Sequence, residues 1–83
     1  MDAATREELV AWYNVAHRAE WHSLEDVRAQ FASADRVGQV LIFNVRNNAY
    51  RLIGRHEFPW PRLFVKALLT HKEYNRKGWL KWS

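Results

Sequence analysis

Four residues near the C-terminus have side chains that could act together on a phosphate group: His71, Tyr74, Arg76 and Lys77. They follow Thr70, which forms with Glu73 the Thr-x-x-Glu pattern typical of a helix N-terminus. An imidazole titrates near neutral pH, and the open backbone N–H groups at a helix start attract anions. The spacing therefore predicts a place where a phosphate is held beside a group that can move a proton.

A pair of β-strands is expected upstream of these residues, at 40–45 and 49–53. The turn between them contains Asn47 and Asn48, and asparagine tolerates the positive φ that a tight hairpin turn requires. The register that follows pairs Val45 with Tyr50, Asn44 with Arg51, Phe43 with Leu52, Ile42 with Ile53 and Val40 with Arg55. One face of this hairpin is wholly apolar, and the other presents three polar side chains on an aliphatic floor: Asn44, Arg51 and Arg55.

A third strand is expected over residues 63–69, with Lys66 at its centre. Strict alternation along a strand gives Lys66 the same face as Phe64 and Leu68. If this strand lies beside the second one, Lys66 joins Arg51 on the polar face. A cation flanked by apolar residues needs a partner, which makes Lys66 a candidate for binding an anion.

Two helices are expected before the strands, over residues 5–20 and 23–31. Thr5 and Glu8 form a candidate capping box for the first helix, and Ser23 is the candidate N-cap of the second. Apolar residues recur at helical spacing in both segments and give each helix one apolar face.

These elements predict one α+β domain over residues 1–83, in which two N-terminal helices pack on a three-stranded antiparallel sheet and a short helical turn follows. The segments 32–38 and 56–61 are expected to be loops, the second because two prolines cannot lie in a central strand. Trp79 and Trp82 are expected to staple the tail to the domain rather than to stack on bases.

The charge of the chain is unevenly distributed. Residues 1–45 hold four Lys or Arg and seven Asp or Glu, a net charge of −3, whereas residues 46–83 hold nine and two, a net charge of +7. The basic half suggests a surface for polyanions, and the plainer alternative is a solvated basic face. Disulfides and thiolate metal sites are excluded because the sequence has no cysteine, and no apolar run is long enough for a membrane helix. Because the sequence has no acidic cluster for a two-metal mechanism, we expect no metal and no other cofactor. Because it has no membrane helix, we expect a cytoplasmic protein without a membrane partner.

Three stretches of the sequence resemble, in this order and spacing, the HigB family of RelE-like toxins: AWY…AEWHSLEDVRAQFASADRVG at 11–38, FNVRNNAYRL at 43–52 and THKEYN…W at 70–79. The combination of FN-x3-N-x-YRL with THxEY is fairly specific, whereas either half alone is weak. The resemblance implies the toxin of a type II toxin–antitoxin system, an endoribonuclease that cuts messenger RNA without metal, commonly on the ribosome. It also implies a helix-turn-helix antitoxin as partner, and a RelE-like fold with an antiparallel sheet curled against N-terminal helices.

The resemblance also implies roles for individual residues. Arg51 of the YRL motif would bind the scissile phosphate, and Lys66 stands where the family usually has a basic residue on its last strand. His71 and Tyr74 of the THxEY motif would be the acid/base or orienting groups. The further candidates for RNA binding are amide and basic side chains: Asn44, Asn48, Arg55, Arg76 and Lys77.

Each assignment has a structural alternative. His71 could simply cap a turn, Tyr74 could be a core aromatic, and Arg51 could form an ordinary cross-strand pair with Asn44. Family members usually carry a further N-terminal strand before the part where this sequence begins, so the resemblance implies an open sheet edge, which a homodimer would cover. The alternative function is a catalytically inactive remnant of the same fold that binds RNA or antitoxin. A DNA-binding protein is disfavoured because the exposed helix faces are acidic or neutral.

Overall fold

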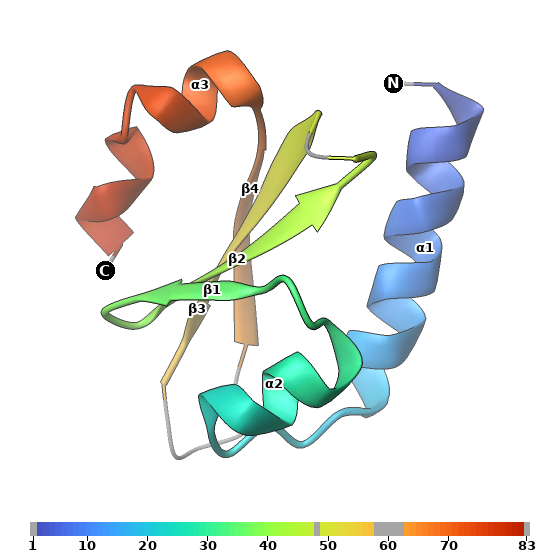
Figure 1. The fold of residues 1–83 in the computed structure, drawn as a ribbon, viewed down its shortest axis with the longest axis vertical. Helices are drawn as coiled ribbons and strands as arrows, with labels where there is room; N and C mark the ends of the chain where they lie inside the picture. The colour runs from blue at the N-terminus through green and yellow to red at the C-terminus, as the bar shows by residue number, and fades with distance from the viewer. Residues whose placement is uncertain (1, 48, 58–62, 83) are drawn as a thin grey trace.

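The computed structural model describes residues 2–47, 49–57 and 63–82. Its helices are α1 (Ala3–Arg18), α2 (Leu24–Gln30), α3 (His71–Asn75) and the 3-10 helix η1 (Gly78–Trp82). Its strands are β1 (Asp35–Val37), β2 (Val40–Val45), β3 (Tyr50–His56) and β4 (Leu63–Thr70). Helices α1 and α2 lie on one side of the sheet, and α3 and η1 lie on the other (Figure 1). The α+β class expected from the sequence is confirmed.

The sheet has four antiparallel strands in the order β1-β2-β3-β4, so the prediction of three strands was wrong by one. The additional strand, β1, falls in the segment 32–38 that was expected to be a loop, and it pairs Asp35 with Ile42 and Val37 with Val40. All three residues of β1 are exposed. A strand without a buried face has no alternation of apolar and polar residues, and its backbone hydrogen bonds to β2 alone define it.

The central hairpin has the register that the sequence predicted, from Val45 opposite Tyr50 to Val40 opposite Arg55. Four residues, 46–49, make its turn, and the two at its start have left-handed backbone angles, with φ of 54° at Arg46 and 51° at Asn47. Asn48 lies outside the described residues. Strand β3 continues past residue 53 and ends at His56, which corrects the expectation that His56 begins a loop.

One face of the sheet forms the larger core with α1 and α2. Its buried members are Trp12, Trp21, Val27, Ala34, Leu41, Phe43, Val45 and Leu52. Four rings meet here: Phe43 lies 5.2 Å from Trp12, 5.3 Å from Phe31 and 5.9 Å from Trp21 between ring centroids. Ser23 caps α2 as expected, because its side chain accepts a hydrogen bond from the Asp26 N–H.

The opposite face forms a second, smaller core. Val40, Ile42 and Ile53 are buried there beneath Trp79, which is only 5% exposed. Tyr74 and Trp82 pack against the same cluster. The aliphatic floor expected from the hairpin therefore exists, and the C-terminal turn covers it. Trp79 staples this turn to the sheet, as predicted.

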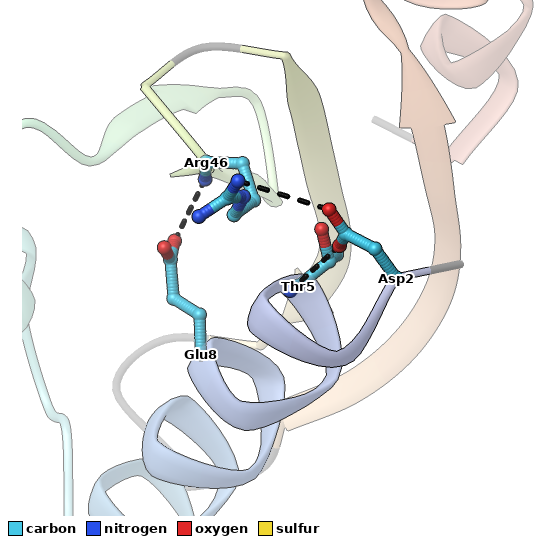
Figure 2. Close-up of polar contacts among 4 residues, drawn as sticks. All are labelled: Asp2, Thr5, Glu8 and Arg46. Carbon is cyan, nitrogen blue, oxygen red and sulfur yellow. Dashed lines mark hydrogen bonds and ion pairs between the residues drawn. The ribbon is translucent and has the colours of Figure 1, made fainter.

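Helix α1 begins earlier than the sequence indicated. Its N-cap is Asp2, whose carboxylate accepts from the Thr5 N–H at 2.9 Å, so the capping box assigned to Thr5 and Glu8 was wrong. Glu8 instead accepts from the Arg46 backbone N–H at 2.8 Å, and the Arg46 guanidinium lies 3.7 Å from Asp2 (Figure 2). These contacts tie the start of α1 to the hairpin turn.

Candidate active site

Arg51 and Tyr74, two of the predicted catalytic residues, are in contact. Arg51 lies on β3, opposite Asn44 of β2 and Leu69 of β4. Its guanidinium carbon is 5.3 Å from the centroid of the Tyr74 ring, within the distance of a cation–π interaction. Arg51 is half-buried, so part of the residue remains open to solvent.

Tyr74 is itself held by a second aromatic ring. The rings of Tyr74 and Trp79 are stacked at 5.1 Å with only 5° between their planes. The Trp79 indole donates to the Tyr74 carbonyl oxygen at 3.0 Å, which fixes the two residues relative to each other. Trp79 is buried in the second core, so this stack of side chains lies against the sheet. We refer to the stacked side chains of Arg51, Tyr74 and Trp79 as the pile. The sequence predicted that Trp79 attaches the tail, but it carries no signal for the second role of Trp79, which is to position Tyr74.

Helix α3 carries His71 and Tyr74 on one face. The capping box of Thr70 and Glu73 is present, with both of its hydrogen bonds, so this sequence motif was correctly identified. His71 is the first residue of the helix and is exposed, and Tyr74 follows it by three positions, which places the two residues on the same side of the helix. The hydrogen bonds from the Thr70 backbone N–H and hydroxyl lower the pKa of Glu73, so this carboxylate stays ionised as a cap.

Lys66 does not follow the parity that the sequence predicted. The strand pair runs in the register Leu52–Leu68, Ile53–Ala67, Gly54–Val65 and Arg55–Phe64. A register shift at Ile53/Gly54 leaves Lys66 as the extra residue of β4. A bulge of this kind breaks the alternation, so Phe64 and Leu68 face opposite sides, and the expectation that Lys66 shares a face with both was wrong. Lys66 is exposed on β4.

Arg55 ties the C-terminal turn to the sheet. Its guanidinium donates to the Trp82 carbonyl oxygen at 2.6 Å and to the Gln39 side-chain oxygen, and it lies 4.0 Å from the Glu57 carboxylate. Three acceptors therefore already occupy the guanidinium that was expected to bind RNA.

Three other candidates for RNA binding lie on β2 and at or after the end of α3. Asn44 is exposed on β2 directly opposite Arg51. Arg76 is the C-cap of α3, and Lys77 follows it with a left-handed φ of 60°, and both are exposed. Asn48 belongs to the turn that is only partly described. The structure thus brings together Arg51, Tyr74 and Asn44, with His71 on the adjoining helix.

Another histidine, His56, lies on the other face of the sheet and, unlike His71, is buried. His56 is 1% exposed and lines a cavity of about 270 Å³ with Trp12, His17 and Trp21 among others. Burial is the main cause that lowers the pKa of His56, and the nearby charges of Arg36 and His22 lower it further. Alternation along β3 puts His56 on the face away from Arg51, so it does not belong to the candidate active site.

The described part of the chain has neither a cluster of metal ligands nor a membrane-spanning helix. Its His, Asp and Glu side chains form no group of three that could hold a metal ion. None of its helices has the length and apolar character needed to cross a membrane.

A comparison with protein families matches residues 5–77 to the HigB_toxin family, described as a RelE-like toxic component of a toxin–antitoxin system. A search of curated proteins found no match to the chain. The matched residues include most of α1, the central hairpin and α3, and so all the residues of the pile except Trp79. The chain therefore belongs to the HigB_toxin family of RelE-like toxins.

Proposed function

We propose that this toxin is an endoribonuclease that cleaves messenger RNA and that an antitoxin neutralises it. The observation that carries the proposal is the Arg51 guanidinium, held 5.3 Å from the Tyr74 ring centroid on a half-exposed face of the sheet. Cleavage of RNA requires that the 2′-hydroxyl lose a proton, that the phosphorane charge be stabilised and that the 5′-oxygen gain a proton. Side chains around this pile can meet all three requirements.

Arg51 binds the scissile phosphate in this mechanism. Its planar fork of N–H donors matches two phosphate oxygens at once, and fixed positive charge of this kind is usually the largest contribution to catalysis. His71, acting with Tyr74, takes the proton from the 2′-hydroxyl and returns one to the 5′-oxygen. Lys66, Arg76 and Lys77 attract the RNA backbone, and Asn44 is close enough to Arg51 along the ladder to contact a neighbouring base or sugar.

The biological setting follows from the family. A toxin of a toxin–antitoxin system has an antitoxin partner. We propose that this partner is a helix-turn-helix protein, and that cleavage takes place on the ribosome in the cytoplasm. We also propose that the chain's own side chains carry the reaction without a metal cofactor, so cleavage should survive a chelator. A homodimer through the exposed edge of β4, where Phe64 and Val65 are 47% and 55% exposed, stays a prediction that sedimentation equilibrium tests.

The decisive experiment is induced expression of the chain in a bacterium, with growth and messenger RNA half-life as readouts. We expect the parent to arrest growth and deplete messenger RNA. Arg51→Met and His71→Ala should abolish both effects, because loss of a charge-stabilising or proton-transferring group typically costs about 10²–10³-fold in rate. The control is Arg18→Gln, which removes an exposed charge at the end of α1, on the other side of the sheet.

The accumulated amount and the melting temperature of each variant must equal those of the parent for the comparison to hold. Arrest by Arg51→Met at the level of the parent would remove Arg51 from the mechanism. If the folded parent itself neither arrests growth nor cleaves RNA, the chain is a binding protein of this fold.

A further inference from the structure

A second feature on the same side of the sheet has the composition of a nucleotide site. A hollow of about 250 Å³ lies between the end of β4, the end of α3 and η1, and its lining includes Leu69, Arg76, Trp79, Lys81 and Trp82. We refer to it as the C-terminal hollow. Its volume suits one planar base, and its walls combine two indole rings with two cations.

The charges of the C-terminal hollow favour an anion. Arg76 and Lys81 are exposed and carry the positive charge. The acidic residue of the lining, Glu73, accepts hydrogen bonds at its carboxylate from the Thr70 backbone N–H at 3.0 Å and serves as the helix cap. Its charge is therefore partly compensated locally, and the two cations dominate the opening.

Trp82 is attached to the sheet through both its backbone and its side chain. Its carbonyl oxygen accepts from Arg55 at 2.6 Å, and its side chain packs partly against the second core. Trp82 is partly exposed, and the Lys81 ammonium lies over its ring, 4.9 Å from the centroid. An exposed cation–π contact is weak, so a base can displace Lys81 and stack on the ring. The freed ammonium then reaches the phosphate of the same nucleotide.

The C-terminal hollow adjoins the candidate active site through two of its lining residues. Trp79 lines the hollow and also stacks against Tyr74. Leu69 lines the hollow and pairs with Arg51 across the ladder. A single RNA strand that places a phosphate at Arg51 can therefore place a neighbouring base at Trp82.

The geometry points to the C-terminal hollow as a subsite for one nucleotide of single-stranded RNA, in which the base stacks on Trp82 and the phosphate contacts Lys81 and Arg76. This inference rests on the proposed function for the identity of the ligand. It adds a base-binding position outside the residues of the YRL and THxEY motifs. Stacking on an indole is tolerant of base identity, so the subsite favours single strands over duplexes without selecting a sequence.

The test measures binding of a fluorescent single-stranded RNA hexamer with 2′-O-methyl groups, which cannot be cleaved because it has no free 2′-hydroxyl. We expect Trp82→Leu to weaken binding about 5- to 150-fold, the range for loss of one base–aromatic stack. Trp82→Phe keeps an aromatic face and should stay within a few fold of the parent. Lys81→Gln should reduce the slope of log affinity against log salt by about 0.7, as expected for one phosphate contact on a single strand. Arg18→Gln should change neither quantity.

Several results would overturn the inference. One is unchanged affinity of a folded Trp82→Leu. If that variant unfolds, an unchanged affinity and salt slope for Lys81→Gln decides against the subsite instead. A third is an oligoglutamate peptide that binds as tightly as the RNA and depends equally on Trp82, since the hollow would then bind acidic protein segments.

The outcome is separable from that of the proposed function. If the parent arrests growth and Trp82→Leu binds RNA as tightly as the parent, the proposed subsite is wrong and the proposed ribonuclease activity stands. If RNA binding depends on Trp82 but the parent cleaves no RNA, the proposed subsite stands and the proposed ribonuclease activity is wrong.

Discussion

At the scale of single residues, Tyr74 combines two roles that substitution can separate. Its ring joins Arg51 to Trp79, and its hydroxyl is the group proposed to share proton transfer with His71. Tyr74→Phe keeps the ring and removes the hydroxyl. We expect it to lower the cleavage rate about 10²–10⁴-fold with an unchanged melting temperature, because general acid–base catalysis typically contributes that much.

Tyr74→Leu is the matched comparison, because it removes both the ring and the hydroxyl. It should lower the cleavage rate at least as far as Tyr74→Phe and also lower the melting temperature. A Tyr74→Phe protein that cleaves a model RNA at the parental rate would restrict Tyr74 to positioning Arg51.

A second prediction at this scale concerns His56 and pH. Burial lowers the pKa of His56 in the folded chain, and the charges of Arg36 and His22 add to this effect, whereas a hydrogen bond to the Trp21 backbone opposes it. An unfolded histidine has its ordinary pKa of 6.5, whereas the lowered pKa of the folded one keeps it neutral to lower pH. The unfolded state thus binds more protons in this window, and the free energy of unfolding falls as pH falls from about 6.5.

Urea titrations between about pH 5 and pH 8 measure this dependence. We expect His56→Gln to flatten it, and His17→Gln, which alters an exposed histidine lining the same cavity, to leave it intact. If the slope against pH persists in His56→Gln, other groups are responsible for it.

At the scale of the elements, the sequence predicted the parts that turn position and helix capping define. The hairpin register followed from the position of the turn between the two apolar segments, because turns of two or four residues centred there give the same facing pairs. The α3 capping box followed because Thr70 and Glu73 have no competing cap nearby. These two correct elements brought Arg51 and Tyr74 to the same side of the sheet.

The errors at this scale have identifiable physical causes. Strand β1 was missed because all its residues are exposed, and the bulge at Lys66 was missed because one extra residue leaves no mark in an apolar run. The start of α1 was misplaced because Asp2 and Thr5 are both good N-caps, and the tertiary contact of Asp2 with Arg46 favours the earlier one. The sequence also carries no sign that the Arg55 guanidinium donates a hydrogen bond to the Trp82 carbonyl oxygen in the C-terminal turn.

This junction between α1 and the hairpin gives a prediction. Asp2→Ala removes both the cap and the ion pair with Arg46, whereas Asp2→Asn keeps a capping oxygen and removes only the charge. Melting temperatures should therefore rank parent highest, then Asp2→Asn, then Asp2→Ala. Hydrogen bonds from Thr5 lower the pKa of Asp2, so its contribution is present at neutral pH and is lost as acid protonates the carboxylate. Equal melting temperatures for the parent and Asp2→Ala would mean that the cap observed in Figure 2 does not stabilise the chain.

At the scale of the whole molecule, one sheet separates two apolar clusters (Figure 1). Strands β2 and β3 contribute side chains to both, with Phe43 and Leu52 on one face and Ile42 and Ile53 on the other. Loss of either cluster therefore exposes the strands that form the other. The site depends on this arrangement, because Tyr74 rests on Trp79 in the smaller cluster while the larger one holds the sheet.

We therefore expect the two clusters to unfold together, as small domains usually do. The five tryptophans allow a direct measurement, since fluorotryptophan labelling gives each a fluorine resonance that single Trp→Phe variants assign. The native resonances of Trp12 and Trp21 should disappear at the same urea concentration as those of Trp79 and Trp82. Arg55→Gln, which breaks the bond to the Trp82 carbonyl, should lower the midpoint of all four equally. Earlier loss of the Trp79 and Trp82 signals would instead mean that the C-terminal turn, and with it the position of Tyr74, opens while the larger core remains folded.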